Sequence, residues 1–351
     1  MSLLKNLRLE RARASNRYKD GAFHNTADIT AGLKGNPLPI LGELFFNGKA
    51  RVPPRPVRVE SPLAAWSKPV SPAGLRVTWL GHSTLLLEVD GKRVLTDPVF
   101  GERASPFSFA GPRRFHATPA TLAELPPLDA VLVSHDHFDH LCAPTMRALA
   151  RLRVPIVTSL GVGARLERFG VDPSVITELD WWEEHTLPGA ELTFTATPAQ
   201  HFSGRGLTDR NETLWSSFVL RTARHRLFFS GDTGLMDEFS EIGRRLGPFD
   251  LVMLETGAWH PSWGGIHLGP ANALKAFDLL GGGTLLPVHW GTFDLALHAW
   301  EEPVETLLQL AGTRRVLTPP LGRAFEPSQV EGPTPWWRDD ALTLAAPGVN
   351  S

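Results

Sequence analysis

The segment SHDHFDHL, residues 134–141, constrains this chain more than any other part of its sequence. It places three imidazoles and two carboxylates within six residues, directly after the apolar run AVLV, residues 130–133. An apolar run followed by polar residues is typical of a buried strand that ends at a functional site of an α/β protein. These polar groups would remain unsatisfied if they were buried without a counter-ion, and a divalent metal satisfies them. The spacing His-x-His-x-Asp-His therefore predicts a metal site rather than an exposed polar loop.

One such loop can supply at most part of two metal coordination shells, so the hypothesis requires further His and Asp residues at other strand ends. Three residues meet this requirement: His201 after TFTATPAQ, Asp232 after LFFSG, and His289 after TLLPV. Taken alone, each would more often be a core or turn residue than a ligand. Their recurrence beside the first motif favours one converged site, and neutral imidazoles with Asp carboxylates are a typical zinc ligand set.

Strand-like and helix-like segments alternate along the chain, which indicates the α/β class. Residues 75–97 predict paired strands with Asp90-Gly91 as the tight turn. Beyond them, short apolar runs alternate with helical patterns near residues 144–151, 161–169, 235–246, 270–280 and 303–311. The length of 351 residues fits either two domains or one domain of about 250 residues with a terminal extension.

The domain organisation is expected to have three parts: an N-terminal arm (1–60), a main domain (61–330) and a C-terminal tail (331–351). In the arm, Leu41, Leu44 and Phe45 have helical spacing. We expect this apolar face to pack on the main domain rather than on a membrane or in a substrate groove, because exposed apolar faces are rare.

Charge and composition exclude several classes of protein. The formal net charge is -2 and no long Lys/Arg run occurs, which argues against nucleic-acid binding. The single cysteine, Cys142, cannot form an internal disulfide, and the N-terminus alternates apolar with charged residues instead of presenting a signal-peptide core. No stretch approaches the roughly 18 apolar residues of a membrane span. We therefore expect a cytoplasmic protein, with peripheral membrane contact through the arm and the oligomeric state left open.

Together, these motifs resemble the metallo-β-lactamase superfamily. The flanking sequence segments resemble N-acylphosphatidylethanolamine-hydrolysing phospholipase D and its bacterial relatives over roughly residues 20–325. These segments include TWLGHST, LTDPVF, ELDWWEE, TPAQHFSGR, LFFSGDTG, HLGPANA and VHWGTFDLAL. The resemblance implies an αββα sandwich of the metallo-β-lactamase type with an N-terminal extension.

The resemblance also implies two zinc ions with a hydroxide between them, with iron or manganese open as replacements for one or both. The first zinc would bind His135, His137 and His201, the second would bind Asp139, His140 and His289, and Asp232 would bridge both. Five neutral imidazoles and two carboxylates against two divalent ions leave a charge of about +2, or +1 with the hydroxide. That field matches a monoanionic phosphodiester.

The implied activity is a phospholipase D-type phosphodiesterase that acts on N-acylphosphatidylethanolamine-like lipids through the hydroxide. Metals about 3.5 to 4 Å apart can activate a water and stabilise phosphoryl oxygens. Asp139 or Asp232 would accept the water's proton. His267 matches the extra active-site histidine of the family, where it would act as an acid or a hydrogen-bond donor. The alternative for His267 is a helix-capping or surface histidine.

Two departures from the family pattern bear on this interpretation. Relatives commonly have Tyr and Asp where this chain has Phe138 and Cys142. Neither position is a ligand in the family, and we expect Cys142 to be buried and inert rather than a soft ligand or a redox-sensitive thiol. His260 also departs from the pattern, which leaves details of the substrate pocket open.

Other residues near the motifs carry weaker predictions. Asp97, His82 and Thr233 lie near strand ends, where they either fix the tautomers of ligating imidazoles or make ordinary turn hydrogen bonds. Loop tryptophans that either line an acyl pocket or simply pack are Trp181, Trp182, Trp215, Trp259 and Trp263. Histidines expected to be structural or exposed are His116, His185, His225 and His298.

Other functions are compatible with the same ligands. A lactonase, or another ester or amide hydrolase, would use the same metal chemistry, because fold and metals do not select the scissile bond. A di-iron oxygen-reducing protein would be expected to have a carboxylate at the position of His137, so the imidazole there favours zinc hydrolysis. A non-catalytic metal-binding or lipid-binding protein would keep the ligands without turnover.

Overall fold

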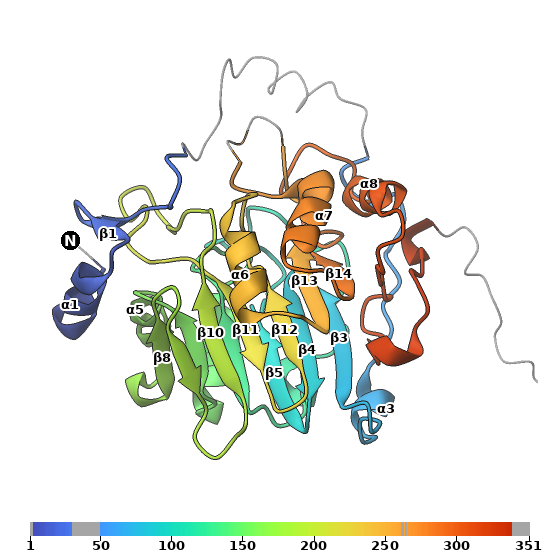
Figure 1. Ribbon diagram of the computed structural model, residues 1–351, viewed down its shortest axis with the longest axis horizontal. Coiled ribbons are helices and arrows are strands. Elements are labelled where there is room, and N and C mark those ends of the chain that lie inside the picture. The colour runs from blue at the N-terminus through green and yellow to red at the C-terminus, as the bar shows by residue number, and fades with distance from the viewer. Residues whose placement is uncertain (1–2, 30–49, 261–262, 264, 339–351) are drawn as a thin grey trace, which may run out of the picture.

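Two β-sheets face each other in the structure, a computed structural model that describes residues 3–29, 50–260, 263 and 265–338 (Figure 1). The first sheet, in the order β15-β3-β4-β5-β6-β7-β8, contains β3 (Leu75–Gly81), β4 (Thr84–Val89), β5 (Lys92–Thr96), β6 (Ala130–Val133), β7 (Ile156–Ser159), β8 (Ile176–Leu179) and β15 (Ala324–Phe325). The second, in the order β14-β13-β12-β11-β10-β9, contains β9 (Glu184–Thr186), β10 (Thr193–Thr197), β11 (Ser217–Arg221), β12 (Arg226–Phe229), β13 (Leu251–Glu255) and β14 (Leu285–Val288).

Helices cover the outer face of each sheet. The short helix α3 (Leu63–Trp66), α4 (Ala143–Leu149) and α5 (Gly163–Arg168) contribute to the apolar cluster on the first sheet, and α6 (Glu238–Leu246), α7 (Gly269–Leu279) and α8 (Glu302–Leu310) to the cluster on the second. Along β12, Phe228 faces these helices, whereas Leu227 and Phe229 face the core between the sheets. This alternation is the period-two pattern of a strand buried on both faces. The predicted αββα sandwich is confirmed.

The local predictions for strands and helices also agree with the structure. Val89 of β4 pairs with Lys92 of β5, so Asp90 and Gly91 form the two-residue turn. Both residues have positive φ, 47° and 79°, as a type I′ hairpin turn requires. The five helical patterns coincide with α4 to α8.

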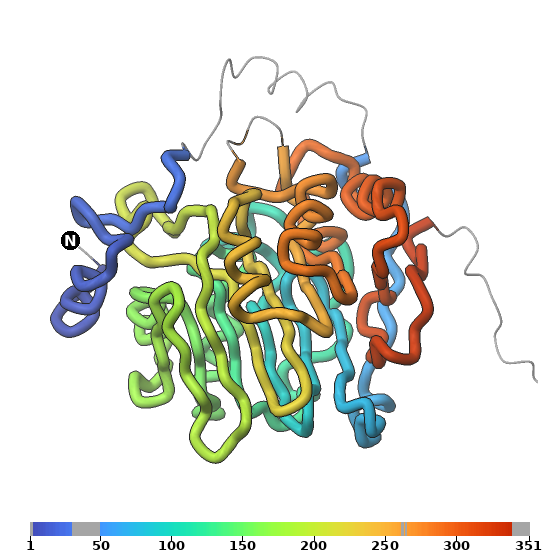
Figure 2. Tube along the Cα trace, in the orientation of Figure 1, coloured from blue at the N-terminus to red at the C-terminus, as the bar shows by residue number. Residues whose placement is uncertain are grey.

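The arm has two described parts. Residues 50–60 run along one side of the sandwich, where the Glu60 N–H donates to the Leu321 carbonyl. The part from residue 3 to residue 29 lies on the other side, near α5 and β8 (Figure 2). It contains α1 (Asn6–Ala14) and a two-stranded ribbon of β1 (Tyr18–Lys19) and β2 (Ala22–Phe23). Buried arm side chains, including Leu4 and Phe23, pack with Leu160, Leu214 and Trp215. Leu41, Leu44 and Phe45 lie outside the described residues.

The C-terminal segment, expected as a tail from residue 331, packs into the core through two tryptophans. Trp336 and Trp337 are buried between the sheets, and the ring of Trp336 lies 5.5 Å from that of Trp290. The sequence pattern did not reveal this packing because two adjacent aromatic residues carry no helical or strand periodicity. Residues 339–351 lie outside the described part.

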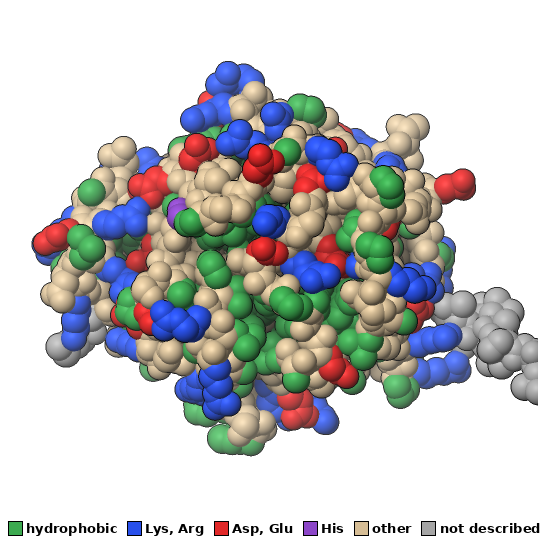
Figure 3. Space-filling view, turned by 90° about the horizontal axis from the view of Figure 1, so that it is seen from below, with side chains coloured by type: hydrophobic (Ala, Val, Ile, Leu, Met, Phe, Trp, Pro, Cys, Tyr) green, Lys and Arg blue, Asp and Glu red, His purple; other side chains and the backbone are tan. Residues whose placement is uncertain are grey.

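The exposed surface gives two further observations. Among the described residues, no helix is both long and apolar enough to cross a membrane. On the face seen in Figure 3, Lys and Arg side chains are interspersed with Asp and Glu side chains. That face therefore presents mixed charge rather than an extended cationic surface.

Candidate metal centre

The seven residues predicted as ligands lie together at one edge of the sandwich, beyond the carboxyl ends of strands from both sheets. They are His135, His137, Asp139 and His140 after β6, His201 after β10, Asp232 after β12 and His289 after β14. Each strand is anchored by apolar packing, so the strand end fixes where the following polar side chain begins. The rule of strand followed by ligand type thus describes the actual geometry.

One group of ligand-type atoms consists of His135, His137, His201 and Asp232. His137 Nδ1 lies 3.0 Å from His135 Nε2 and 3.2 Å from His201 Nε2. Asp232 Oδ2 lies 3.8 Å from the same nitrogen of His135 and 3.7 Å from that of His201. Three ring nitrogens and one carboxylate oxygen thus converge as a four-ligand set, which is typical of zinc.

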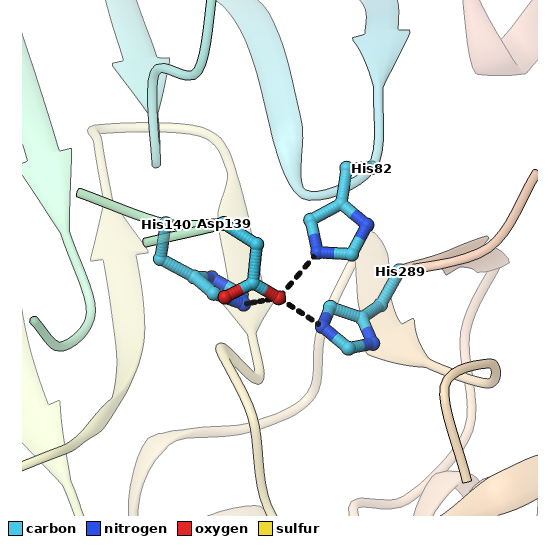
Figure 4. Close-up of side chains that lie close together, drawn as sticks. All are labelled: His82, Asp139, His140 and His289. Carbon is cyan, nitrogen blue, oxygen red and sulfur yellow. Dashed lines mark hydrogen bonds and ion pairs between the residues drawn. The ribbon is translucent and has the colours of Figure 1, made fainter. Parts of the chain in front are cut away.

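A second group surrounds Asp139 (Figure 4). Asp139 Oδ2 lies 3.5 Å from His140 Nε2 and 3.4 Å from His289 Nε2. It also lies 3.0 Å from His82 Nε2. His82, which the sequence suggested only as a support for ligands, therefore belongs to the ligand-type cluster itself.

Asp232 joins the two groups, because its second oxygen turns toward the second one. Asp232 Oδ1 lies 3.1 Å from His140 Nε2 and 3.2 Å from His289 Nε2. All three atoms are buried, and despite these distances none has hydrogen-bond geometry with any partner. A buried polar atom without a hydrogen-bond partner lowers the stability of the folded protein unless an ion or another group binds it. These two groups therefore fit a pair of metal ions, with Asp232 facing both. Asp232 and His289 also form a third ligand-type group with Glu255 and His267.

The electrostatics of the cluster favour a cation. Burial and neighbouring imidazoles hold the pKa of His135 and of His201 well below its ordinary value, which keeps these rings neutral and able to bind a metal. Burial also lowers the pKa of His289, but Asp232 and Asp139 outweigh it and raise that pKa to about 10. A proton on His289 thus compensates buried negative charge, which a divalent ion would do more effectively.

Outer hydrogen bonds orient the ligand-type rings. Asp97 Oδ2 accepts a hydrogen bond from His140 Nδ1 at 2.7 Å and another from the Ser134 hydroxyl at 2.6 Å. His201 Nδ1 lies 2.9 Å from the Ile266 carbonyl. In both rings the Nε2 atom is left for the cluster, as a metal-binding histidine requires. The Thr233 hydroxyl instead donates to the Gly234 carbonyl and accepts from the Gln200 backbone N–H.

Three residues of the centre have strained backbone conformations. His82, Asp97 and His289 have φ values of 53°, 33° and 65°, in the left-handed region that residues with a β-carbon rarely adopt. Strain of this kind persists where the surrounding structure holds it and is common at functional sites. Here the strained residues directly follow β3, β5 and β14; the side chains of His82 and His289 enter the cluster, and that of Asp97 binds His140.

Comparison with known proteins agrees with this geometry. Residues 92–290 match a family model described as a beta-lactamase superfamily domain. The chain belongs to the β-lactamase superfamily. It is 44% identical to an uncharacterized protein of Mycobacterium tuberculosis over 329 residues, covering 92% of this chain and 87% of the relative. It is 39% identical to N-acyl-phosphatidylethanolamine-hydrolyzing phospholipase D 1 of Caenorhabditis elegans over 258 residues, covering 70% of this chain and 72% of the relative.

Solved structures show the same fold. An isothiocyanate hydrolase from Delia radicum gut bacteria has a TM-score of 0.57 at 24% identity, covering 72% of this chain and 98% of that chain. Igni18, a metallo hydrolase from Ignicoccus hospitalis, has a TM-score of 0.55 at 22% identity, again covering 72% and 98%. With the superfamily membership and the His/Asp cluster, the chain is a metal-dependent hydrolase of the β-lactamase superfamily.

Asn25, in the N-terminal arm, contacts the candidate metal centre but was not predicted from the sequence. Its side-chain amide donates to the His201 carbonyl at 2.7 Å and accepts from the His201 backbone N–H at 2.9 Å. Trp215 Nε1 also donates to the Asn25 oxygen, at 3.1 Å. A single polar residue 176 positions from its partner leaves no local pattern to detect.

Asn25→Ala is expected to lower metal affinity by roughly 10 to 100-fold, as for other supports of metal ligands. The substitution removes two hydrogen bonds that fix the backbone of His201, while the strands keep their own pairing. Competition with a chromogenic chelator measures the change. Asn16→Ala, at an exposed position of the same arm, serves as the control and should bind metal like the parent. Equal affinity in both variants would show that Asn25 does not support the ligand.

A pocket of about 300 Å³ opens beside the candidate metal centre. Its apolar wall contains Phe202, Trp263, Ile266 and Leu295, and its polar part contains His267, Arg210 and several ligand-type residues. His267 is therefore placed at the site, where its Nδ1 lies 2.7 Å from Glu255 Oε2. Of the five tryptophans considered from the sequence, Trp263 lines the pocket and Trp215 packs in the core under the arm.

The remaining residues singled out in the sequence lie outside the metal-ligand groups of the described chain. Cys142 is buried with Val99, Ala104 and Phe293. His225 binds Asp90 at 3.0 Å, and Phe138 stacks against the guanidinium of Arg205 at 3.9 Å. Burial and the neighbouring Arg114 lower the pKa of His116 to about 3, which fits a neutral structural residue.

Proposed function

We propose that this chain is a dinuclear zinc-dependent phosphodiesterase of the phospholipase D type, acting on N-acylphosphatidylethanolamine-like lipids. The observation that carries the proposal is the position of Asp232, which turns one oxygen toward each of two His/Asp groups. Similarity to the Caenorhabditis elegans phospholipase over 72% of that protein supports the substrate class.

The ligand set supports zinc in both positions. His135, His137 and His201 would hold one ion, Asp139, His140 and His289 the other, and Asp232 both. Imidazoles with few carboxylates suit zinc better than the hard cations, which prefer all-oxygen sites. Two bound zinc ions would polarise the phosphoryl oxygens and lower the pKa of a bound water toward 7.

Side chains of this protein would bind the substrate and transfer protons. Asp139, in the second group, and Asp232, which faces both groups, are positioned to accept the proton of the attacking water. His267, whose ring lies beside those of His201 and His289 in the wall of the pocket, would donate to a phosphate or leaving oxygen. The apolar wall that includes Phe202 and Trp263 would exclude water and contact the hydrocarbon part of a lipid.

A turnover panel with metal analysis tests this proposal. The metal-loaded protein is assayed with N-acylphosphatidylethanolamine in mixed micelles, bis(4-nitrophenyl) phosphate, a γ-lactone and a β-lactam. We expect two zinc ions per chain, release of N-acylethanolamine with phosphatidic acid, and hydrolysis of the chromogenic diester. Hydrolysis of the lactone or β-lactam alone would overturn the substrate class, and bound metal without turnover would indicate a binding protein.

A further inference from the structure

Glu255 is a buried carboxylate that joins segments of the metal centre. It is the last residue of β13 and has no exposed surface. Its Oε1 atom accepts hydrogen bonds from the backbone N–H of Thr233 at 3.0 Å and from that of Leu268 at 2.9 Å. These two bonds tie the loop that carries Asp232 to the loop that carries His267.

The other oxygen of this carboxylate holds the ring of His267. His267 Nδ1 lies 2.7 Å from Glu255 Oε2, and His289 Nδ1 lies 3.6 Å from the same atom. The Glu255 carboxylate accepts two N–H groups through Oε1 and also acts as an acceptor through Oε2. The ring nitrogen that faces Oε2, Nδ1 of His267, is therefore the donor. The nitrogen left to exchange a proton with a substrate is Nε2.

Neighbouring rings restrict His267 further. Its ring centroid lies 5.0 Å from that of His201, edge to face, and 5.5 Å from that of His289, stacked. Its side chain keeps 11% of its surface exposed and forms part of the pocket wall. A ring packed between two others and held at Nδ1 keeps one orientation, which a group acting on a substrate needs.

We propose that Glu255 is a positioning residue that fixes His267 with Nε2 toward the leaving oxygen of the substrate. This inference rests on the proposed phosphodiesterase function. During hydrolysis a water oxygen bonds to phosphorus, and the bond from phosphorus to the leaving oxygen breaks with its electron pair on that oxygen. His267 Nε2 gives the leaving oxygen a proton, the water's proton passes to a carboxylate of the centre, and exchange with solvent restores both groups.

Glu255→Gln tests this role through its dependence on the leaving group. The ethanolamine oxygen of the lipid needs a proton to leave, whereas 4-nitrophenolate does not. We expect kcat to fall about 10²-fold with N-acylphosphatidylethanolamine and no more than about threefold with bis(4-nitrophenyl) phosphate, with KM little changed. His267→Gln should show the same selectivity, and the double variant should be no worse than His267→Gln. Equal losses on both substrates would overturn the proposal.

A second measurement does not depend on turnover. In a ¹⁵N-edited spectrum of the metal-loaded parent protein, the Nδ1 proton of His267 should give a low-field resonance, as expected for a proton bonded to a carboxylate. The resonance is assigned by its loss in His267→Gln and should shift or vanish in Glu255→Gln. Its absence from the parent overturns the proposal even if phosphodiesterase activity is present. If the resonance is present but the protein has no phosphodiesterase activity, the proposed function is wrong and the role of Glu255 in holding His267 stands.

Glu88→Gln is the matched control, since Glu88 is a buried strand carboxylate that binds Arg76 and Arg93 and pairs with the start of β3, at the opposite end of that strand from His82. It should alter stability and leave the ratio of activities on the two substrates unchanged. Metal content should be two ions per chain in the parent and in Glu255→Gln. A third ion that disappears in Glu255→Gln would make Glu255 a metal ligand and contradict the positioning role.

Discussion

Asp232→Asn is expected to lower turnover by about 10³-fold, equivalent to about 4 kcal/mol of transition-state stabilisation. The carboxylate turns Oδ2 toward His135 and His201 and Oδ1 toward His140 and His289. Asparagine keeps one oxygen but replaces the other with an amide nitrogen, which has no lone pair to offer a cation. Metal content measured by inductively coupled plasma mass spectrometry should fall below two ions per chain.

The same experiment needs a test of folding and a matched substitution. Asp237→Asn changes an exposed carboxylate five positions away and should keep full turnover and both metals. His135→Ala should match the loss in Asp232→Asn, because it removes a ligand-type imidazole from the first group. Circular dichroism should show intact secondary structure in all three. Full activity in either Asp232→Asn or His135→Ala would refute the assignment of the metal centre.

The sequence predicted those parts of the molecule that follow from local periodicity. Each site residue after β6, β10, β12 and β14 was found by the same rule, a buried apolar run followed by a ligand-type side chain. The rule works because parallel and mixed sheets bring the carboxyl ends of their strands to one edge. The turn at Asp90-Gly91 was found for a similar local reason, since two successive positive φ angles favour this dipeptide.

The parts that the sequence did not predict depend on contacts between distant segments. Asn25 reaches His201 from the arm, and Glu255 was passed over although it also ends a strand, because a single Glu in LVMLETG is unremarkable without its partners. His82 was considered as a support for a ligand, and its Nε2 lies 3.0 Å from Oδ2 of the predicted ligand Asp139. The sequence did not show that His82 is also a ligand-type member of that group. Trp336 fills the core through ring packing that has no periodic signature.

Removing the metals with a chelator is expected to abolish hydrolysis and to lower the thermal stability of the folded chain. His140 Nε2, His289 Nε2 and Asp232 Oδ1 are buried without hydrogen-bond partners, so the metal-free site leaves a desolvation cost that bound cations relieve. Ions at about 1,000 times their Kd would stabilise the native state by about 4 kcal/mol per site. For a domain of this size that corresponds to a rise in Tm of roughly 8 °C or more.

Scanning calorimetry of parent protein, chelated protein and chelated protein after addition of Zn²⁺ measures this effect. Zn²⁺ should restore both Tm and turnover, and Mg²⁺ should restore neither, because Mg²⁺ prefers an octahedral shell of oxygen ligands that these imidazoles cannot provide. Asp232→Asn should gain less Tm on addition of Zn²⁺ than the parent, since one carboxylate no longer faces both ions. A chelated protein with unchanged Tm and turnover would show that the buried cluster holds no functional metal, and the hydrolase mechanism would have to be located elsewhere in the molecule.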